Sequence, residues 1–373
     1  MTVTRTPDRI RNAAIGLFSS RWFETVSVAE VCRAAGVSNG VFYRYHRGKE
    51  DLVRALVDGF LTTFEAEVTG IDGSTLDERV LNLFAAVFNA GVHHSPMVTL
   101  FREAQYRYPE YEERLRAIYR RSCREVFGRP VSEAEYLYAI SGLRFNSTRA
   151  IYDGLDRRPD LIARFVLNGV FPDAIDAVQR VLVPAEFPHV AEEEPADSRG
   201  RLIRNGMRLI GGRAYHRIGV ADIARETGLA VGTFYTYFSS KEEFLSVIVE
   251  QIGRQTRRYL SEQARSHATR LEQEAYGVWH FLSYFNGHPE YYSLVREAEF
   301  VAKPWVRRYY DAFEAGYMEN LPFTDDTERR IAANFLMGLS HYVGIEALLN
   351  RRIPDIPAFI AELTTLMCTG VRP

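Results

Sequence analysis

The chain has 373 residues, of which 46% are apolar and 25% are charged. Because this length is about two to three times that of a common domain, we expect more than one domain. The composition excludes collagen-like, coiled-coil and wholly disordered chains. Its 46 basic and 48 acidic side chains give a net charge of −2, so the total charge does not indicate a nucleic-acid partner.

The charge is unevenly distributed along the chain. Residues 1–60 carry 9 basic and 6 acidic side chains, and residues 199–260 carry 11 and 5. The remainder carries 26 basic and 37 acidic side chains. Two mildly basic stretches are therefore set in an acidic chain, and the local field decides which partner a surface attracts.

Nothing in the sequence indicates secretion or insertion into a membrane. Three cysteines are too few and too scattered for a disulfide framework or a zinc site. Arginines precede the first apolar run, so no signal peptide is visible. The most apolar long window, residues 332–349, contains Asn334, His341 and Glu346 and falls short of a membrane span. We therefore expect a cytoplasmic protein with no membrane partner.

The predicted elements are helices throughout, because apolar residues recur at helical spacing and no sustained strand-type alternation occurs. In the first half of the chain we predict helices over residues 8–20, 27–34, 38–45, 49–69, 75–93, 95–107, 109–127, 132–153 and 159–181. In the second half we predict helices over residues 198–212, 220–227, 231–237, 241–265, 268–287, 288–301, 304–320, 325–349 and 355–370. The predicted fold class is therefore all-α.

The two halves of the chain repeat one plan. At an offset of 192 residues, 9–57 align with 201–249 without a gap, and 14 of the 49 positions are identical. The densest match sets VAEVCRAAGVSNGVFYRYHRGKE against VADIARETGLAVGTFYTYFSSKE. Further on, FREAQY matches VREAEF at an offset of 194. A period of about 180 residues indicates a duplicated domain rather than a solenoid.

Between the repeats lies VPAEFPHVAEEEPADS, residues 183–198, whose three prolines and acidic triplet Glu192–Glu194 indicate a solvated linker. We predict a first module over residues 1–182, with a head at about 8–50 and a body at about 51–182. We predict a second module over residues 199–373, with a head at about 199–242 and a body at about 243–373.

Two short helices joined at Gly36 predict a helix-turn-helix in the first head. Glycine permits the left-handed backbone of a tight turn, and the second helix of such a pair can enter the major groove of DNA. At helical spacing Phe42 and His46 share an inward face, whereas Asn39 and Tyr43 face outward.

The second head repeats this pattern with different outward residues. Phe234 and Phe238 point inward, while Val231 and Tyr235 point outward. The two heads therefore share an inward face and differ in the surface that each offers to a partner.

Glycine and lysine recur at matched positions of the two heads. Gly40 and Gly232 lie inside the second helices, where glycine costs roughly 1 kcal/mol, so we expect a close approach of backbone there. The chain has only three lysines, and Lys49 and Lys241 both fall on the first turn of a long helix. A helix N-terminus attracts anions, so each lysine suits a phosphate group and predicts one phosphate contact.

These stretches resemble the N-terminal DNA-binding region of the TetR/AcrR (tetracycline-repressor-like) regulators. That family's pattern includes isoleucine-alanine, a glycine and then gly-x-phe-tyr-x-x-phe-x-x-lys-glu, which reads here VAEVCRAAGVSNGVFYRYHRGKEDL and VADIARETGLAVGTFYTYFSSKEEF. The resemblance implies two tandem nine-helix modules, each with a three-helix helix-turn-helix head and a helical body for effector binding and dimerisation. It also implies a ligand-responsive transcriptional regulator whose partner is double-stranded DNA.

The resemblance implies which residues contact DNA. Phosphate contacts are implied for Tyr43, Lys49, Tyr235 and Lys241, and base or nearby backbone contacts for Ser38, Asn39, Arg44, Val231, Thr233 and Thr236. A phosphate clamp and a helix cap are implied for Thr25 and Ser27. The sequence departs from this pattern at Arg217 and Gly219, which stand where the first copy has that threonine and serine, and at His46, where phenylalanine is usual.

Two interpretations remain open for residues in the bodies. Aromatic residues either line effector pockets or pack in the cores, and core packing is the commoner fate at helical spacing. The effector candidates are Phe84, Phe88, Phe101, Tyr106, Phe145, Phe281, Phe285, Tyr292, Phe300 and Phe335. Two further pairs, inside otherwise apolar helices, form interhelical salt bridges or anchor the effector: Arg102–Glu103 and Arg296–Glu297.

No feature indicates an enzyme, a metal site or a cofactor. The sequence has no nucleophile–base signature, no phosphate-cradling glycine loop and no metal-ligand spacing. We expect five dispersed histidines to be structural: His93, His94, His280, His288 and His341.

We therefore expect a transcriptional repressor that a small apolar effector releases from DNA. Helices 132–153 with 159–181 and 325–349 with 355–370 would join the two modules as a four-helix bundle, making an intramolecular pseudo-dimer on an asymmetric operator. A homodimer with four heads is the alternative assembly. The alternative function is a helical ligand-binding or interaction protein in which one or both heads have lost DNA binding.

Overall fold

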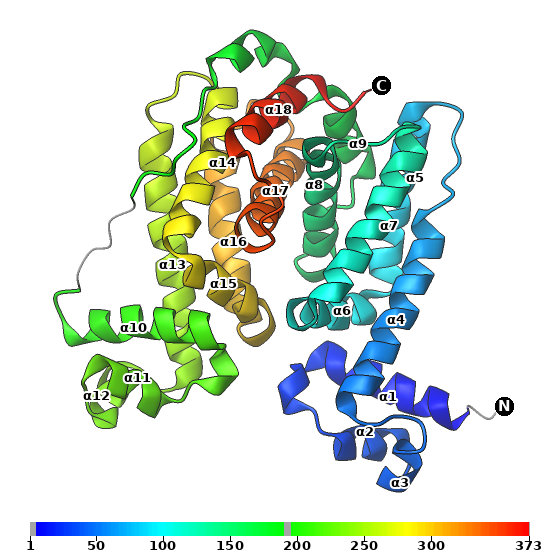
Figure 1. Cartoon of the computed structure of the whole chain (residues 1–373), viewed down its shortest axis with the longest axis vertical. Coiled ribbons are helices and arrows are strands. Elements are labelled where there is room, and N and C mark those ends of the chain that lie inside the picture. The colour runs from blue at the N-terminus through cyan, green and yellow to red at the C-terminus, as the bar shows by residue number, and fades with distance from the viewer. Residues whose placement is uncertain (1–4, 190–194, 373) are drawn as a thin grey trace. The chain divides into compact units, whose positions relative to one another are not determined.

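The computed structural model describes residues 5–189 and 195–372, and every regular element in these ranges is helical, as predicted. The predicted linker triplet Glu192–Glu194 lies outside the described residues. Nine α-helices fall in each copy of the sequence, α1–α9 in the first and α10–α18 in the second (Figure 1).

The elements of the first copy are α1 (Thr6–Ser20), η1 (Phe23–Thr25), α2 (Val28–Ala35), α3 (Asn39–Phe42), α4 (Lys49–Val68), α5 (Leu76–His93), α6 (Ser95–Arg107), α7 (Pro109–Phe127), α8 (Glu133–Tyr152), α9 (Pro159–Asn168) and η2 (Pro172–Arg180). Those of the second copy are α10 (Ser198–Arg213), η3 (Tyr215–Arg217), α11 (Val220–Thr227), α12 (Val231–Tyr237), α13 (Lys241–Ala264), α14 (Arg270–Gly287), α15 (Pro289–Val301), α16 (Lys303–Met318), α17 (Asp326–Gly344), η4 (Ile345–Leu349) and α18 (Ile356–Thr369).

One predicted helix is divided in the structure. The prediction over residues 159–181 is wrong in its middle, because α9 ends at Asn168 and a 3₁₀ segment, η2, follows. Gly169 has a φ of 81°, and an added Cβ there would lie 2.5 Å from the carbonyl group of Cys368. A left-handed backbone and this tight approach to another chain segment end the helix.

The chain forms two compact units whose boundaries differ from those of the two sequence copies. The first unit comprises residues 5–131 and 147–159, and the second comprises residues 132–146 and 160–372 apart from those not described. The second unit therefore holds residues 133–146 of α8 and all of α9 except Pro159 from the first copy, together with all described helices of the second copy.

In the first unit the head attaches to one end of the long helix α4 (Figure 1). α1 packs on α2 and α6, and α4 packs on α5, α6 and α7. The body core contains a cluster of rings in which Phe60 lies 5.7 Å from Phe101 and 6.0 Å from Phe64, whose ring lies 5.6 Å from Tyr119.

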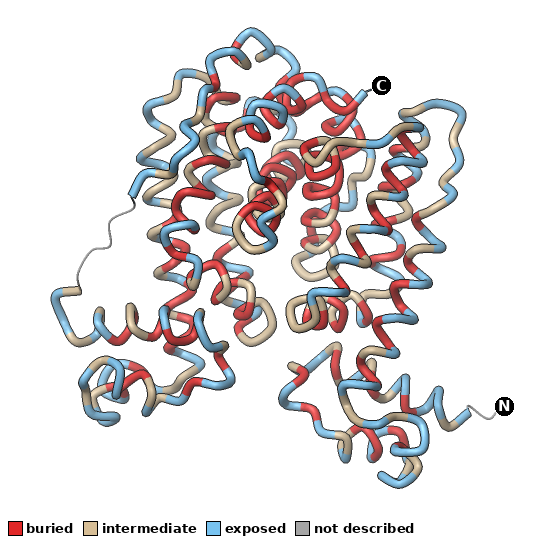
Figure 2. Tube along the Cα trace, viewed as in Figure 1, coloured by how far each residue is buried: buried red, intermediate tan, exposed pale blue. Residues whose placement is uncertain are grey.

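In the second unit α17 is the buried core helix (Figure 2). Among the described residues one helical stretch, Asp326–Leu349, is long and apolar enough to cross a membrane, and 78% of its apolar window is buried inside the protein. The head attaches to α13, and α10 also packs on α15 (Figure 1).

Helices of both copies share the core of the second unit. The Phe335 ring of α17 lies 5.3 Å from Tyr138 of α8 and 5.8 Å from Phe165 of α9. The backbone N–H of Phe171 donates to Met367 (2.8 Å), and that of Val371 donates to Val166 (2.7 Å). Segments of α8 and α9 therefore pack with α17 and with the end of the second copy inside this unit.

Candidate DNA-reading heads and ligand cavity

The first head has the predicted turn, but its second helix, predicted over residues 38–45, is regular only over α3 (Asn39–Phe42). Gly36 has a φ of 64° at the end of α2, and the Ser38 side chain caps α3 by accepting a hydrogen bond from the N–H of Val41 (3.3 Å). Phe42 is fully buried, whereas Tyr43 is 56% exposed. The helix is thus fixed from below and presents the phenol to solvent, with Asn39 and Arg44 also exposed.

The two residues predicted as a clamp and a cap before α2 have local partners. Ser27 forms a capping box: its hydroxyl accepts from the N–H of Glu30 (3.2 Å), and its own N–H donates to the Glu30 carboxylate (2.8 Å). Hydrogen bonds from Arg21 and Ser27 lower the pKa of Glu30 to about 2. Thr25 donates its hydroxyl to the carbonyl of Trp22 (2.7 Å). Ser27 is therefore the predicted helix cap, and both residues remain exposed.

The second head repeats this construction around a more aromatic core. Gly228 has a φ of 70°, and Phe234 and Phe238 are buried with their rings 5.3 Å apart. Tyr235 is 54% exposed and Val231 is 42% exposed. The other predicted contacts are Thr233, which is half-buried, and Thr236, which is exposed and donates to the carbonyl of Gly232 (3.1 Å).

The helix glycines face open space instead of the close backbone approach that we predicted. A Cβ added to Gly232 would have no atom of the described residues within 4 Å, apart from the backbone of its own helix and its two chain neighbours. Around Gly40 the only such atom is the Ser38 hydroxyl oxygen, at 3.9 Å. The surface beside each exposed tyrosine is therefore unobstructed.

The two lysines contact the protein backbone, which the sequence did not predict. Lys49 donates to the carbonyl of Phe23 (2.8 Å), with its ammonium 4.1 Å from the centre of that ring. Lys241 donates to the carbonyl of Tyr215 (2.6 Å), with its ammonium 3.8 Å from that ring. Both side chains are half-buried, and burial lowers the pKa of each ammonium. Each lysine has an internal role that is separate from the implied phosphate contact.

The glutamate of each arginine–glutamate pair contacts a head. Glu103 of α6 accepts a hydrogen bond from the N–H of Phe23 (3.1 Å), and Glu297 of α15 accepts one from the N–H of Tyr215 (2.8 Å). Each of these carboxylates is buried. Each glutamate therefore joins a body helix to its head, a contact that the sequence did not predict.

The second body contains an apolar cavity of about 380 Å³. Phe281 and Tyr292, two of the predicted effector residues, line it together with Tyr309 and Phe313. Gly277 also lines this cavity. A Cβ added to Gly277 would have no atom of the described residues within 4 Å, apart from its chain neighbours and the backbone of its own helix. The guanidinium of Arg257 lies 5.4 Å from the Phe313 ring, and burial lowers its pKa.

The remaining effector candidates lie in packed surroundings. Phe101 belongs to the ring cluster of the first body, and Phe145 lies 5.2 Å from the Tyr310 ring in the second unit. The Phe285 ring lies 4.8 Å from that of Phe281 and 5.0 Å from that of Tyr292, and Phe335 lies between helices of both copies. Phe84 and Phe88 are buried, and Tyr106 and Phe300 are half-buried.

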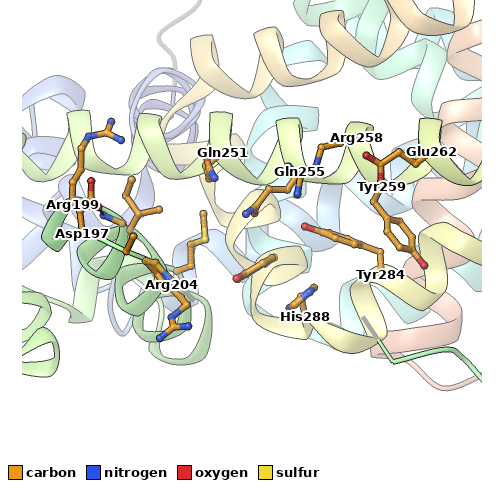
Figure 3. Close-up of a pocket in the computed structure, with 16 residues that line it drawn as sticks. Asp197, Arg199, Arg204, Gln251, Gln255, Arg258, Tyr259, Glu262, Tyr284 and His288 are labelled. Atoms are coloured by element: carbon orange, nitrogen blue, oxygen red, sulfur yellow. Dashed lines mark hydrogen bonds between the residues drawn. The ribbon is translucent and has the colours of Figure 1, made fainter. Parts of the chain in front are cut away.

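A second cavity of about 470 Å³ lies where the second head meets its body (Figure 3). Arg204 of the head helix α10 lies on one side, and Gln251 and Gln255 project from α13 on the other. Tyr284 and His288, whose rings are 5.0 Å apart, also line it. The cavity therefore lies between parts of α10 and α13, while α10 packs on α15 beside it.

Among the described residues no three or more histidine, cysteine, aspartate or glutamate side chains are grouped as a metal site would require. The histidines have other surroundings. His94 bonds to Glu67 (2.9 Å), His288 stacks on Tyr291 and His341 lies near Phe145.

Comparisons with known proteins match the heads. The family described as bacterial regulatory proteins, tetR family, matches residues 10–56 and 202–248. The HTH-type transcriptional repressor KstR2 of Mycobacterium tuberculosis is 31% identical over 96 residues, which cover 25% of this chain and 48% of that protein. The chain thus spans about half the length of the curated relatives it matches.

Solved structures match over about half of the chain. The fatty acid degradation regulator FadR from Bacillus halodurans is 18% identical with a TM-score of 0.40, covering 48% of this chain and 99% of its own. FadR from Bacillus subtilis, in complex with stearoyl-CoA, is 21% identical with a TM-score of 0.39, covering 46% and 99%. A TetR-like regulator from Rhodococcus sp. RHA1 is 15% identical with a TM-score of 0.39, covering 47% and 97%.

Proposed function

Two stretches of the chain match the tetR family, and from this premise we propose that the chain is a ligand-released repressor of that family whose two heads read one asymmetric operator. The observation that carries the proposal is the matched pair of exposed phenols, Tyr43 and Tyr235, on recognition helices held by buried phenylalanines. A phenol combines an apolar ring with a hydrogen-bond donor, which suits the sugar-phosphate backbone of DNA.

The two heads offer different groups to the bases. Asn39 matches the donor and acceptor of adenine, and Arg44 matches guanine or a phosphate. Val231, Thr233 and Thr236 offer methyl groups that suit thymine. Thr25, Ser27 and Ser38 are exposed in the first head and complete the proposed set of DNA contacts. Lys49 and Lys241 differ from the other members of this set because each already donates a hydrogen bond to a backbone carbonyl of its own head.

We propose that the two modules pair within one chain. The packing of α8 and α9 with α17 and α18 supports this arrangement, because these are the helices that would form the interface of a pseudo-dimer. A covalent tether replaces association between chains by pairing at roughly millimolar effective concentration. A homodimer with four heads is the rival assembly, and the mass of the chain in solution distinguishes the two.

The effector site that we propose is the apolar cavity of the second body. Its aromatic wall favours a small apolar ligand, and the half-buried Arg257 favours an acidic group on that ligand. A ligand releases DNA only if it binds more tightly to a geometry of the body in which the heads are misplaced. Occupancy of this cavity would therefore shift the protein away from the DNA-binding state.

The operator tests the proposed function directly. Purified protein should bind a random duplex at low salt, and selection from a random library should return sites with two different half-sites. A perfect palindrome among the selected sites would contradict the two-headed reading. A failure to bind any duplex would favour the alternative, a helical ligand-binding or interaction protein without DNA binding.

The cavity is tested by the substitution Gly277→Leu, which copies the buried Leu83 at the matching place of the first body. Leucine at this helical position should fill empty space and stabilise the protein by roughly 1 kcal/mol. The apolar anionic dye anilinonaphthalene sulfonate should fluoresce with the wild type and lose most of this signal with the variant. Gly59→Leu, at an exposed position of α4, is the matched control and should leave the dye signal unchanged.

A further inference from the structure

One peptide unit in each head is held from both sides in the same way. In the first head the N–H of Phe23 donates to Glu103 (3.1 Å), and its carbonyl accepts from Lys49 (2.8 Å). In the second head Glu297 accepts from the N–H of Tyr215 (2.8 Å), and Lys241 donates to the carbonyl of that residue (2.6 Å). The arrangement recurs although the held residue differs.

Each arrangement joins three parts of a module. The held residue begins the 3₁₀ turn between the first and second head helices. The lysine opens the long helix, α4 or α13, and the glutamate lies on the body helix that packs on the first head helix, α6 or α15. The turn therefore cannot move without breaking hydrogen bonds to both the long helix and the body.

Burial of the two glutamates raises the free-energy cost of breaking these hydrogen bonds. The side chains of both glutamates are nearly inaccessible, at 8% for Glu103 and 5% for Glu297. A buried carboxylate that loses its donor keeps its desolvation penalty without the compensating hydrogen bond. Nearby charges differ between the copies, because Arg107 lies 3.8 Å from Glu103 whereas His216 lies 3.7 Å from Glu297.

We propose that Glu103 with Lys49, and Glu297 with Lys241, are matched clamps that set the position of each head on its body, and that both lysines act through the clamped peptide rather than on DNA phosphate. The four residues are then positioning residues for DNA recognition. Their effect on DNA binding rests on the proposed function, whereas their effect on the head turn does not.

The second clamp adjoins the proposed effector cavity. Arg296 lines that cavity, and the next residue of α15 is Glu297. The cavity of Figure 3 also lies between this head and its body, and the head helix α10 packs directly on α15, the helix that carries Glu297. A ligand that displaces α15 would move the acceptor that holds the second head.

Lysine variants of the full chain test the clamp by two measurements. In Lys241→Met, amide hydrogen exchange of residues 215–220 without DNA should rise about tenfold, because the turn loses one of its two holds. Affinity for a random duplex should fall, while the slope of log affinity against log salt stays at the wild-type value. Arg44→Met, which removes a proposed phosphate or base contact, is the positive control and should reduce that slope by about 0.9 if its contact is to phosphate.

The outcomes separate the clamp from the rival roles. A reduction of the slope by about 0.9 in Lys241→Met, or an unchanged exchange rate, overturns the proposal. Lys241→Arg keeps a donor and should restore slow exchange, which distinguishes loss of the clamp from general misfolding. Glu297→Gln keeps an acceptor oxygen and should give an intermediate rate. Faster exchange in a protein that binds no DNA would sustain the clamp and refute the proposed function.

Discussion

Gly142→Val should destabilise the second unit by roughly 3 kcal/mol, because the new side chain would occupy space that is filled by Phe335. An added Cβ at Gly142 would come within 2.6 Å of several atoms of the Phe335 ring, which is fully buried between Tyr138 and Phe165. At about 2–4 °C per kcal/mol, the midpoint of thermal unfolding should fall by roughly 6–12 °C.

This result would test the packing that we propose as the pairing of the two modules. Gly59→Val is the control, because it puts the same β-branched residue in a helix at an exposed position with open space around it. Adding Phe335→Leu to Gly142→Val should recover part of the lost stability, since a smaller side chain relieves the overlap. Equal unfolding midpoints for the two valine variants would show that α8 and α17 do not pack closely here.

Tyr43→Ala and Tyr235→Ala should each weaken binding to a duplex about tenfold, which corresponds to the loss of one phosphate hydrogen bond and some apolar contact. The effects should multiply in the double variant, because independent sites contribute additive free energies. Fluorescence anisotropy with a labelled duplex at constant salt measures all three. Tyr43→Phe and Tyr235→Phe remove only the hydroxyl group, so they separate its contribution to the affinity from that of the ring.

The single variants also decide whether both heads read DNA. Tyr45→Ala and Tyr237→Ala remove similarly exposed rings that lie outside the proposed contact set, and both should stay within about twofold of the wild type. If Tyr43→Ala binds as tightly as the wild type while Tyr235→Ala does not, the first head has become a structural half. Such a result would leave one reading head and remove the reason for an asymmetric operator.

Features that depend on neighbours along the chain were predictable from the sequence. Helical periodicity indicated the eighteen α-helices of the described residues, and residue identities at a fixed offset revealed the duplicated plan. The inward places of Phe42, Phe234 and Phe238 and the outward places of Tyr43 and Tyr235 follow from spacing along one helix. These properties are local, because a few residues determine both the element and its faces.

Contacts between distant residues were decided only by the tertiary structure. The clamps join residues about eighty positions apart, and nothing near Lys49 or Glu103 in the sequence indicates the other. Gly169 reads as an ordinary residue of one long helix until the backbone at Cys368 lies against it. Aromatic residues at helical spacing form a packed cluster in the first body and line a cavity in the second. Whether a packed cluster or a cavity results depends on the side-chain volumes that the facing helices contribute. Periodicity along one helix therefore cannot distinguish the two.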